Sequence, residues 1–289
     1  MDREFRKLTM QRLVKTAGLV SDIVEKSLNI PEAGSTNFKE EFLKTPPGPA
    51  REALIFNELT RRGAPKQLVP ITIDGPNGIK LTYHVMPDYI MIDGVRVTMA
   101  PATAQKVADH FNMRLPTDKI SKQIYQAADT KVRAVPLSSG GYTGAEGQRY
   151  SGREVVEHRI NQSDAALEYN KLTEQEINRQ LNGKPAGLIA GHGKEILQPL
   201  GDPNDVSFGG WQGQNGVALQ PYSTAHKGGA EGHTEYGLYT RLMGNNVTVT
   251  TPDGKQINTT LDKVLENPEL AKAISSTPGS KRYNVGGKR

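Results

Sequence analysis

Cysteine is absent from the 289 residues of this chain. Its absence excludes a disulfide scaffold, a zinc site built on thiolates and a cysteine nucleophile. No apolar run approaches the length of a membrane-spanning helix, so an integral membrane protein is not expected. The opening residues, MDREFRKLTM, lack the apolar core of a secretory signal, and the mature part of an exported protein would lack it too. The net charge is only +5, and we expect no nucleic-acid partner.

The residues that are present indicate a globular protein with many loops. Hydrophobic residues make up 36% of the chain, and 30 glycines and 18 prolines interrupt the apolar segments. This composition is far from that of collagen or of low-complexity sequence. The length is sufficient for one large domain or two small ones, each with a buried core.

Residues 1–50 are expected to stand apart from the rest of the chain. Apolar residues recur at three- and four-residue spacings between positions 13 and 28, which predicts an amphipathic helix. Basic residues crowd its first half; the solvated face of a docking helix is the favoured explanation, and an acidic partner or a membrane surface is the alternative. The helix is therefore a candidate docking element for a protein partner. The prolines of TPPGP at 45–49 indicate a linker.

Residues 51–275 have the pattern of one main α+β domain, with a candidate subdivision near the glycine-rich loop 136–152. Helices are predicted at 51–63, 101–112, 115–128 with Thr117 as its N-cap, 152–162, 172–183 and 260–275. Strands are predicted at 67–73, 79–87, 88–93, 95–99, 186–197, 206–212, 217–226, 235–243 and 246–259. Helices and antiparallel hairpins are segregated rather than alternating, which is typical of the α+β class. Residues 276–289 are expected to form a flexible basic tail.

The six histidines are the natural candidates for chemistry in a chain without cysteine. His84 lies in a strand pattern and His110 ends a helix, so both are interpreted as structural. His158 lies in the predicted helix after the glycine-rich loop, beside two glutamates, and is a candidate acid or base.

Glycine-rich turns surround the other histidines: His192 lies in AGHGKE, and His226 and His233 bracket AHKGGAEGH. Neutral imidazoles with one or two carboxylates are usual ligands of a catalytic zinc that keeps a position open for water. We therefore take His192, His226 and His233 as candidate zinc ligands, with Glu235 or Glu231 as the carboxylate. The spacing matches no strict metal motif, because HExxH is absent and HKGGAEGH is only loosely similar to an element of some zinc D,D-peptidases.

A second hypothesis needs no metal, and uses His158 or His192 as general acid or base. Its charge partners would be four polar residues that follow: Lys194, Glu195, Tyr236 and Arg241. No serine lies in a GxSxG elbow. A third interpretation is that the glycine-rich turns place histidines at the surface without any catalytic role.

Trp211 is the only tryptophan, in the sequence FGGWQGQNG. Its flat face suits a groove for a sugar ring or a peptide, and filling of the core is the alternative. No glycine motif matches a phosphate loop.

Several segments between residues 52 and 243 follow one another in the same order as similar segments of a known protein family. They are EALIFNELTRRGAPKQLVPITI, VMPDYIMIDG, RLPTDKISKQIYQAADTKV, GLIAGHGKEIL, LQPYSTAH and EYGLYTRLM. Together they resemble an uncharacterised family of bacterial proteins that are often exported. The polar positions of that family correspond here to His158, His192, Lys194, Trp211, Gln220, His226, Tyr236 and Arg241.

One segment departs from the family pattern. The family tends to have a Tyr-Ser-His-Gly stretch before the arginine, whereas this chain has YGLYTR at 236–241, and His233 is the candidate replacement for the missing histidine. The family stretch is also similar to the SHGCIR signature of L,D-transpeptidases. The essential cysteine is absent here, which excludes transpeptidation by that route.

The resemblance implies an exported or envelope-associated protein. This implication and the cluster of His, Lys, Glu, Tyr and Arg residues in glycine-rich turns together lead us to expect a hydrolase that acts on a bacterial cell-envelope polymer, the peptide or glycan of peptidoglycan. His192 and His226 would be ligands or acid–base groups, and Lys194 and Arg241 would bind a carboxylate or an oxyanion. The groove would be lined by Trp211 and Gln220. The alternative is a non-catalytic binding or assembly module.

Overall fold

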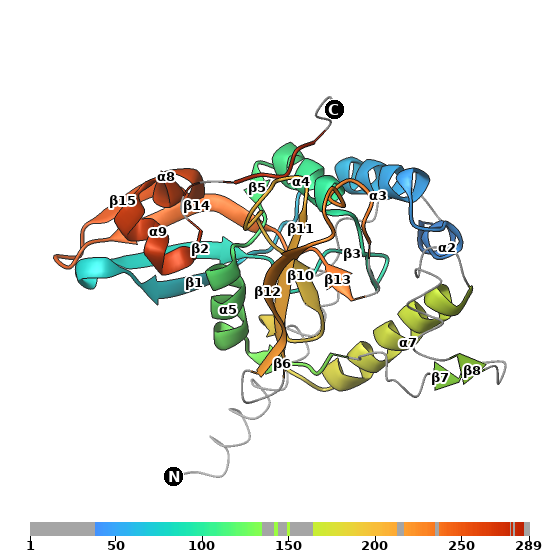
Figure 1. Ribbon diagram of the computed structural model, residues 1–289. Helices are drawn as coiled ribbons and strands as arrows, with labels where there is room; N and C mark the ends of the chain where they lie inside the picture. Colours follow the sequence, from blue (N-terminus) through green and yellow to red (C-terminus); the bar gives the residue numbers. More distant parts are fainter. Residues whose placement is uncertain are drawn as a thin grey trace, which may run out of the picture.

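The structure is a computed structural model, and it describes residues 38–134, 142–143, 149–150, 164–212, 217–234, 237–277, 279 and 281–285. The fold is α+β, as predicted: helices pack around two main sheets that are largely antiparallel (Figure 1). Several predictions lie outside the described residues: the N-terminal amphipathic helix, the helix at 152–162 with His158, and residues Glu235 and Tyr236. In the described part, no helix combines the length and the apolar content needed to cross a membrane.

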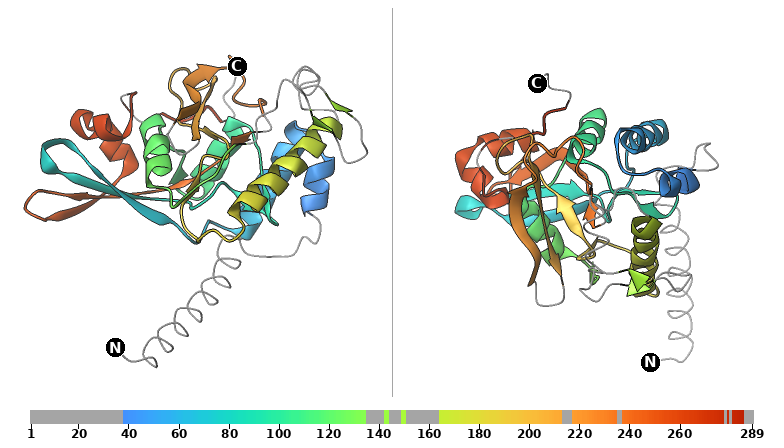
Figure 2. Two further views of the ribbon diagram at one scale, coloured as in Figure 1. Left: turned by 90° about the horizontal axis from the view of Figure 1, so that it is seen from below. Right: turned by 45° about the vertical axis from the view of Figure 1, so that its right-hand side comes forward.

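The larger sheet has five strands: β1 (Val69–Asp74), β2 (Lys80–Val85), β5 (Met113–Arg114), β14 (Met243–Thr250) and β15 (Gln256–Thr260). Two predicted hairpins, β1–β2 and β14–β15, are confirmed, and β2 pairs with β14 between them. The hairpins extend toward one end of the molecule (Figure 2). Alternation along β2 buries Leu81, Tyr83 and Val85 on one face, which is the pattern of a half-buried strand.

The smaller sheet has four strands in the order β12-β11-β10-β13. They are β10 (Lys194–Ile196), β11 (Val206–Gln212), β12 (Val217–Ala225) and β13 (Leu238–Tyr239). The pairing of β10 with β13 is parallel, whereas the other pairs are antiparallel. Three two-stranded ladders complete the strands: β3 (Met91–Ile92) with β4 (Val95–Arg96), β6 (Thr130–Lys131) with β9 (Ile189–Ala190), and β7 (Tyr142–Thr143) with β8 (Arg149–Tyr150).

The helices are α2 (Phe38–Lys44), α3 (Pro49–Arg62), α4 (Pro101–His110), α5 (Asp118–Ala127), α7 (Asp164–Leu181), α8 (Leu261–Glu266) and α9 (Pro268–Ile274). Proline occupies the first turn of α3, α4 and α9, where its missing N–H costs nothing. The predicted N-cap of α5 is confirmed, because Thr117 Oγ1 accepts a hydrogen bond from the Ile120 N–H. Helix α5 contacts strands of both sheets, and α8 contacts β14.

Two segments that were expected to be loose belong to the core. Phe38 and Phe42 of α2 are buried, and the Arg51 guanidinium lies 3.9 Å from the Phe42 ring centroid. Residues 38–44 are therefore a packed helix and not part of a linker. In the predicted flexible tail, Tyr283 is buried, accepts a hydrogen bond from the Ser207 N–H and donates one to the Ser207 carbonyl.

Candidate functional site

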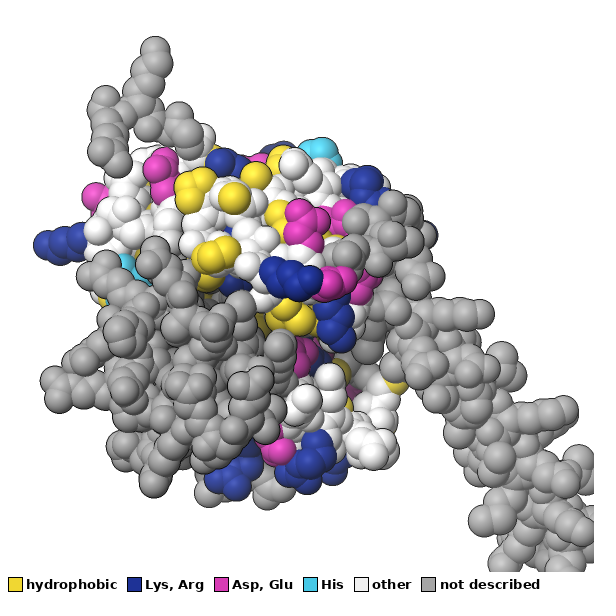
Figure 3. All heavy atoms as spheres, turned by 90° about the vertical axis from the view of Figure 1, so that its right-hand side faces the viewer, with side chains coloured by type: hydrophobic (Ala, Val, Ile, Leu, Met, Phe, Trp, Pro, Cys, Tyr) yellow, Lys and Arg dark blue, Asp and Glu magenta, His cyan; other side chains and the backbone are white. Residues whose placement is uncertain are grey.

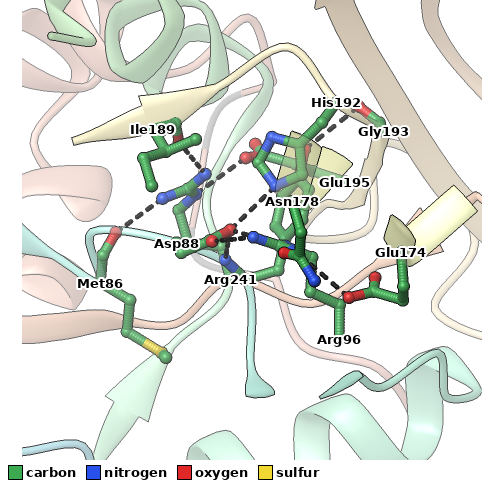
Figure 4. Close-up of polar contacts among 11 residues, drawn as sticks. Met86, Asp88, Arg96, Glu174, Asn178, Ile189, His192, Gly193, Glu195 and Arg241 are labelled. Carbon is green, nitrogen blue, oxygen red and sulfur yellow. Dashed lines mark hydrogen bonds and ion pairs between the residues drawn. The ribbon is translucent and has the colours of Figure 1, made fainter. Parts of the chain in front are cut away.

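A buried acid–histidine pair lies where the β9–β10 turn meets the chain after β2 (Figure 4). The His192 Nε2 atom lies 2.8 Å from Asp88 Oδ1, although the two residues are 104 positions apart. The Asp88 carboxylate also accepts the Tyr89 N–H at 2.6 Å, and its Oδ2 atom accepts from Arg96 Nη2 at 2.7 Å. These donors hold the carboxylate in a single orientation.

The flanking glycines explain the shape of this turn. Gly191 has a φ of 97°, which a residue with a side chain rarely adopts. A Cβ atom on Gly193 would lie 2.4 Å from the ring of Tyr239, so the backbone approaches that ring as only glycine permits. The turn therefore presents His192 to Asp88 with little room for rearrangement.

Burial and charge set the protonation of the pair in opposite ways. Burial lowers the pKa of His192 to about 4, although the neighbouring Asp88 carboxylate favours the charged imidazolium. Burial alone would raise the pKa of Asp88, but the charge of Arg96 and the hydrogen bond from His192 hold it well below its usual range. At neutral pH the imidazole is thus neutral, and Nε2 carries the proton that it donates to Asp88. Its Nδ1 atom is buried and has no hydrogen-bond partner among the described residues.

A second buried pair joins Glu195 of β10 to Arg241, which follows β13. Arg241 is fully buried and donates from Nε to Glu195 Oε1 at 2.9 Å. Its Nη1 and Nη2 atoms donate to the carbonyls of Met86 and Ile189, each at 2.7 Å. The other Glu195 oxygen accepts from Ser121 Oγ at 2.5 Å. In this structure the carboxylate that Arg241 binds is that of Glu195.

The two pairs meet at Tyr89. Its ring centroid lies 4.3 Å from that of His192 and 4.9 Å from that of Tyr239, and the Arg241 guanidinium lies 4.9 Å from its centroid. The Tyr89 hydroxyl donates to the Gly193 carbonyl at 3.1 Å. Sequence reasoning missed Asp88, Tyr89 and Arg96. The available signal was a carboxylate inside the otherwise apolar run of MPDYIMI, because a charge in such a run needs a buried partner.

His226 and His233 lie together, with different neighbours from those of His192. Their rings are stacked at 3.6 Å between centroids, and His226 is exposed with a φ of 51°. The Phe208 ring lies 6.2 Å from that of His226, and Lys194 Nζ lies 5.0 Å from the Phe208 centroid.

The predicted zinc cluster is therefore not assembled from the three histidines. Within the described ranges, no group of three or more His, Asp or Glu side chains could hold a metal ion. His192 faces Asp88 instead of His226 and His233. The fourth candidate ligand, Glu235, lies outside the described residues, and a zinc ion at the stacked histidines stays a prediction.

Trp211 and Gln220 lie on the paired strands β11 and β12. Trp211 is half-buried, its Nε1–H donates to the Tyr222 hydroxyl, and Lys122 Nζ lies 5.1 Å from its ring centroid. Gln220 is also half-buried and lies opposite Gly210 in the ladder. Trp211 thus packs partly against the core and keeps part of its surface exposed.

The described site consists of a neutral imidazole oriented by a carboxylate, and of a buried arginine–glutamate pair beside it. Comparison of this chain with models of protein families, with curated proteins and with solved structures finds no match.

Proposed function

We propose that the protein is a hydrolase that acts on a bacterial cell-envelope polymer, the peptide or glycan of peptidoglycan, with His192 as its general base. The observation that carries the chemistry is the Asp88–His192 pair, in which Nε2 is held by a carboxylate while Nδ1 has no partner among the described residues. A neutral imidazole oriented in this way can take a proton from an attacking water or hydroxyl. The substrate class rests on the family resemblance alone.

The proton would move to Nδ1 of His192 as the oxygen nucleophile forms its bond to the substrate. The resulting imidazolium is stabilised by the Asp88 carboxylate, which Arg96 keeps ionised. His192 then returns the proton to the leaving group. Because the His192 ring is fully buried, the mechanism requires the residues that surround the β9–β10 turn to move and let the substrate reach the ring.

The test is His192→Gln, because the Gln amide nitrogen can replace Nε2 as donor to Asp88 while no base remains at the position of Nδ1. We expect the wild type to release soluble fragments from purified peptidoglycan, measured by liquid chromatography and mass spectrometry. The variant should lose at least about 100-fold in rate, as is usual when a general base is removed. His110→Gln, an exposed histidine at the end of α4, is the matched control and should keep its activity. Full activity of His192→Gln would refute the role of His192.

A binding or assembly module without catalysis is the second candidate. It is favoured by the burial of His192, Glu195 and Arg241, whose charges are paired within the protein as in a structural network. Such a module would co-sediment with peptidoglycan and release it unaltered. Co-sedimentation without any fragment release by the wild type would refute the hydrolase and support this candidate.

A further inference from the structure

A cavity of about 330 Å³ lies between α2, the β3–β4 hairpin, β13 and α7. This volume is sufficient for a small ligand. The face of the molecule that carries α2 and α7 has interspersed basic and acidic side chains around small apolar patches (Figure 3). Phe42, Leu43 and Val95 line the cavity with apolar surface, and Glu174, Asn178 and other polar groups also line it.

Arg96 connects this cavity to the buried pair of Asp88 and His192 (Figure 4). Its Nε and Nη2 atoms donate to Asp88. Its Nη1 atom donates to Glu174 Oε2 at 3.0 Å and to Asn178 Oδ1 at 3.3 Å. Most of the N–H donors of the guanidinium are thus already used in hydrogen bonds within the protein, and few remain for a ligand.

Glu174 is the lining residue with unused binding capacity. Its Oε2 atom accepts a hydrogen bond from Arg96 Nη1. The other, Oε1, is buried and has no hydrogen-bond partner within the described part of the chain. Burial raises the pKa of Glu174 despite the nearby Arg96, because a carboxylate that is only half satisfied loses solvation. A cationic group of a bound ligand would supply the hydrogen-bond donor that Glu174 Oε1 lacks within the described residues.

A lysine also lines the same cavity. Lys39 belongs to the first turn of α2 and is exposed to solvent. The cavity lining therefore combines a buried acceptor, a solvated cation and apolar surface. This combination is complementary to a ligand that carries opposite charges on an aliphatic frame.

We propose that this cavity binds a small molecule bearing a primary ammonium group and a carboxylate on an aliphatic frame. A small rotation of the Glu174 side chain brings Oε1 to the cavity surface, where it accepts a hydrogen bond from the ammonium group. The carboxylate of the ligand pairs with Lys39, and its methylene groups contact Phe42 and Val95. The site does not depend on the hydrolase function, because every contact that defines it lies between α2, α7 and the β3–β4 hairpin.

Nuclear magnetic resonance titration of the full chain tests the site. The probes are straight-chain amino acids from β-alanine to 6-aminohexanoate, compared with carboxylic acids of the same lengths that lack the amine. We expect at least one amino acid to bind saturably and its amine-free counterpart to bind about tenfold more weakly or worse, because a charge-assisted hydrogen bond is lost. Absence of binding by the whole series, or equal binding of the amine-free acids, would overturn the proposal.

Substitutions at Glu174 and Lys39 test which residues bind the ammonium and carboxylate groups of the ligand. Glu174→Gln keeps an acceptor for Arg96 and should weaken binding of the amino acid about tenfold, whereas Glu176→Gln, on the exposed side of the same helix, should change it less than twofold. If Glu174→Gln fails to fold, Lys39→Gln at its exposed position serves instead, and it should weaken the amino acid but not an alkylamine of equal length. Unchanged binding in the folded variants would refute the assignment.

Discussion

The Arg241–Glu195 pair allows a sharp test of how charge is accommodated in this core. Substitution of Arg241 by Met replaces the guanidinium with an unbranched apolar chain and leaves the Glu195 carboxylate with Ser121 as its remaining donor. The carbonyls of Met86 and Ile189 lose their donors at the same time. Removal of one partner from a buried ion pair costs about 3–5 kcal/mol, because the other charge stays buried without compensation. The two carbonyls place Arg241→Met at the upper end of this range, since each unsatisfied buried acceptor costs about 1–3 kcal/mol.

The free energy of unfolding is measured by urea denaturation followed by circular dichroism. A loss of about 5 kcal/mol is a large fraction of the roughly 5–15 kcal/mol that stabilises a typical domain, so we expect a large shift of the midpoint. The double variant Glu195→Gln with Arg241→Met should be destabilised less than the sum of the single variants, because it removes the uncompensated charge.

Arg179→Met is the matched control. Arg179 is 74% exposed on α7 and pairs with Glu176, and exposed pairs of this kind contribute about 0–1 kcal/mol. A cost below about 1 kcal/mol for Arg241→Met, comparable with that of the control, would show that Glu195 is not held as a buried carboxylate, and the reasoning would fail.

Three further predictions concern the same region and its supports. The pKa of His192 in the folded protein is about 4, below its ordinary value of 6.5. Between these two pH values the unfolded chain therefore binds one more proton than the folded chain. The contribution of His192 to the free energy of unfolding is fully present above pH 6.5, and about 3 kcal/mol of it is lost as the pH falls to 4. Urea denaturation at both pH values measures this loss, and His192→Gln should flatten the pH dependence. Gly193→Ala should cost about 1–3 kcal/mol through its collision with the stacked Tyr239 ring, and an unchanged melting temperature would contradict the tight approach. Thr117→Ala should cost about 1 kcal/mol through loss of the α5 N-cap, whereas Thr117→Ser should be nearly neutral in thermal unfolding.

Local patterns in the sequence were sufficient for much of the fold. Hairpins with distinctive turns and amphipathic helices, such as α4 and α5, lie where their periodicity predicts them. Helix α2 was missed because seven residues among prolines and glycines are too short to display a period, although Phe38 and Phe42 anchor it in the core. Its burial is a property of the tertiary packing, which local propensity does not encode.

The candidate site was predictable only in part, because its partners come from distant segments. His192, Glu195 and Arg241 were identified by their residue types, but their interactions depend on long-range pairing. Asp88 is 104 positions from His192. His192 was grouped with His226 and His233 because all three lie in glycine-rich turns, and this local likeness does not bring the three side chains together in space.

The segment from β13 to β14 belongs to both main sheets. It pairs in parallel with β10 in the smaller sheet, passes through Arg241, and enters the larger sheet at Met243 beside β2 and β5. A single stretch of backbone therefore connects the two sheets, and the buried guanidinium of Arg241 ties it to the carbonyls of Met86 and Ile189. Separation of the sheets would break the pairing of this stretch with β10 or with β2 and β5, so we expect the two sheets to unfold together. We therefore expect the motion that admits a ligand to His192 to come from the surrounding turns, because the short connection between β13 and β14 opposes a hinge-like opening of the two sheets.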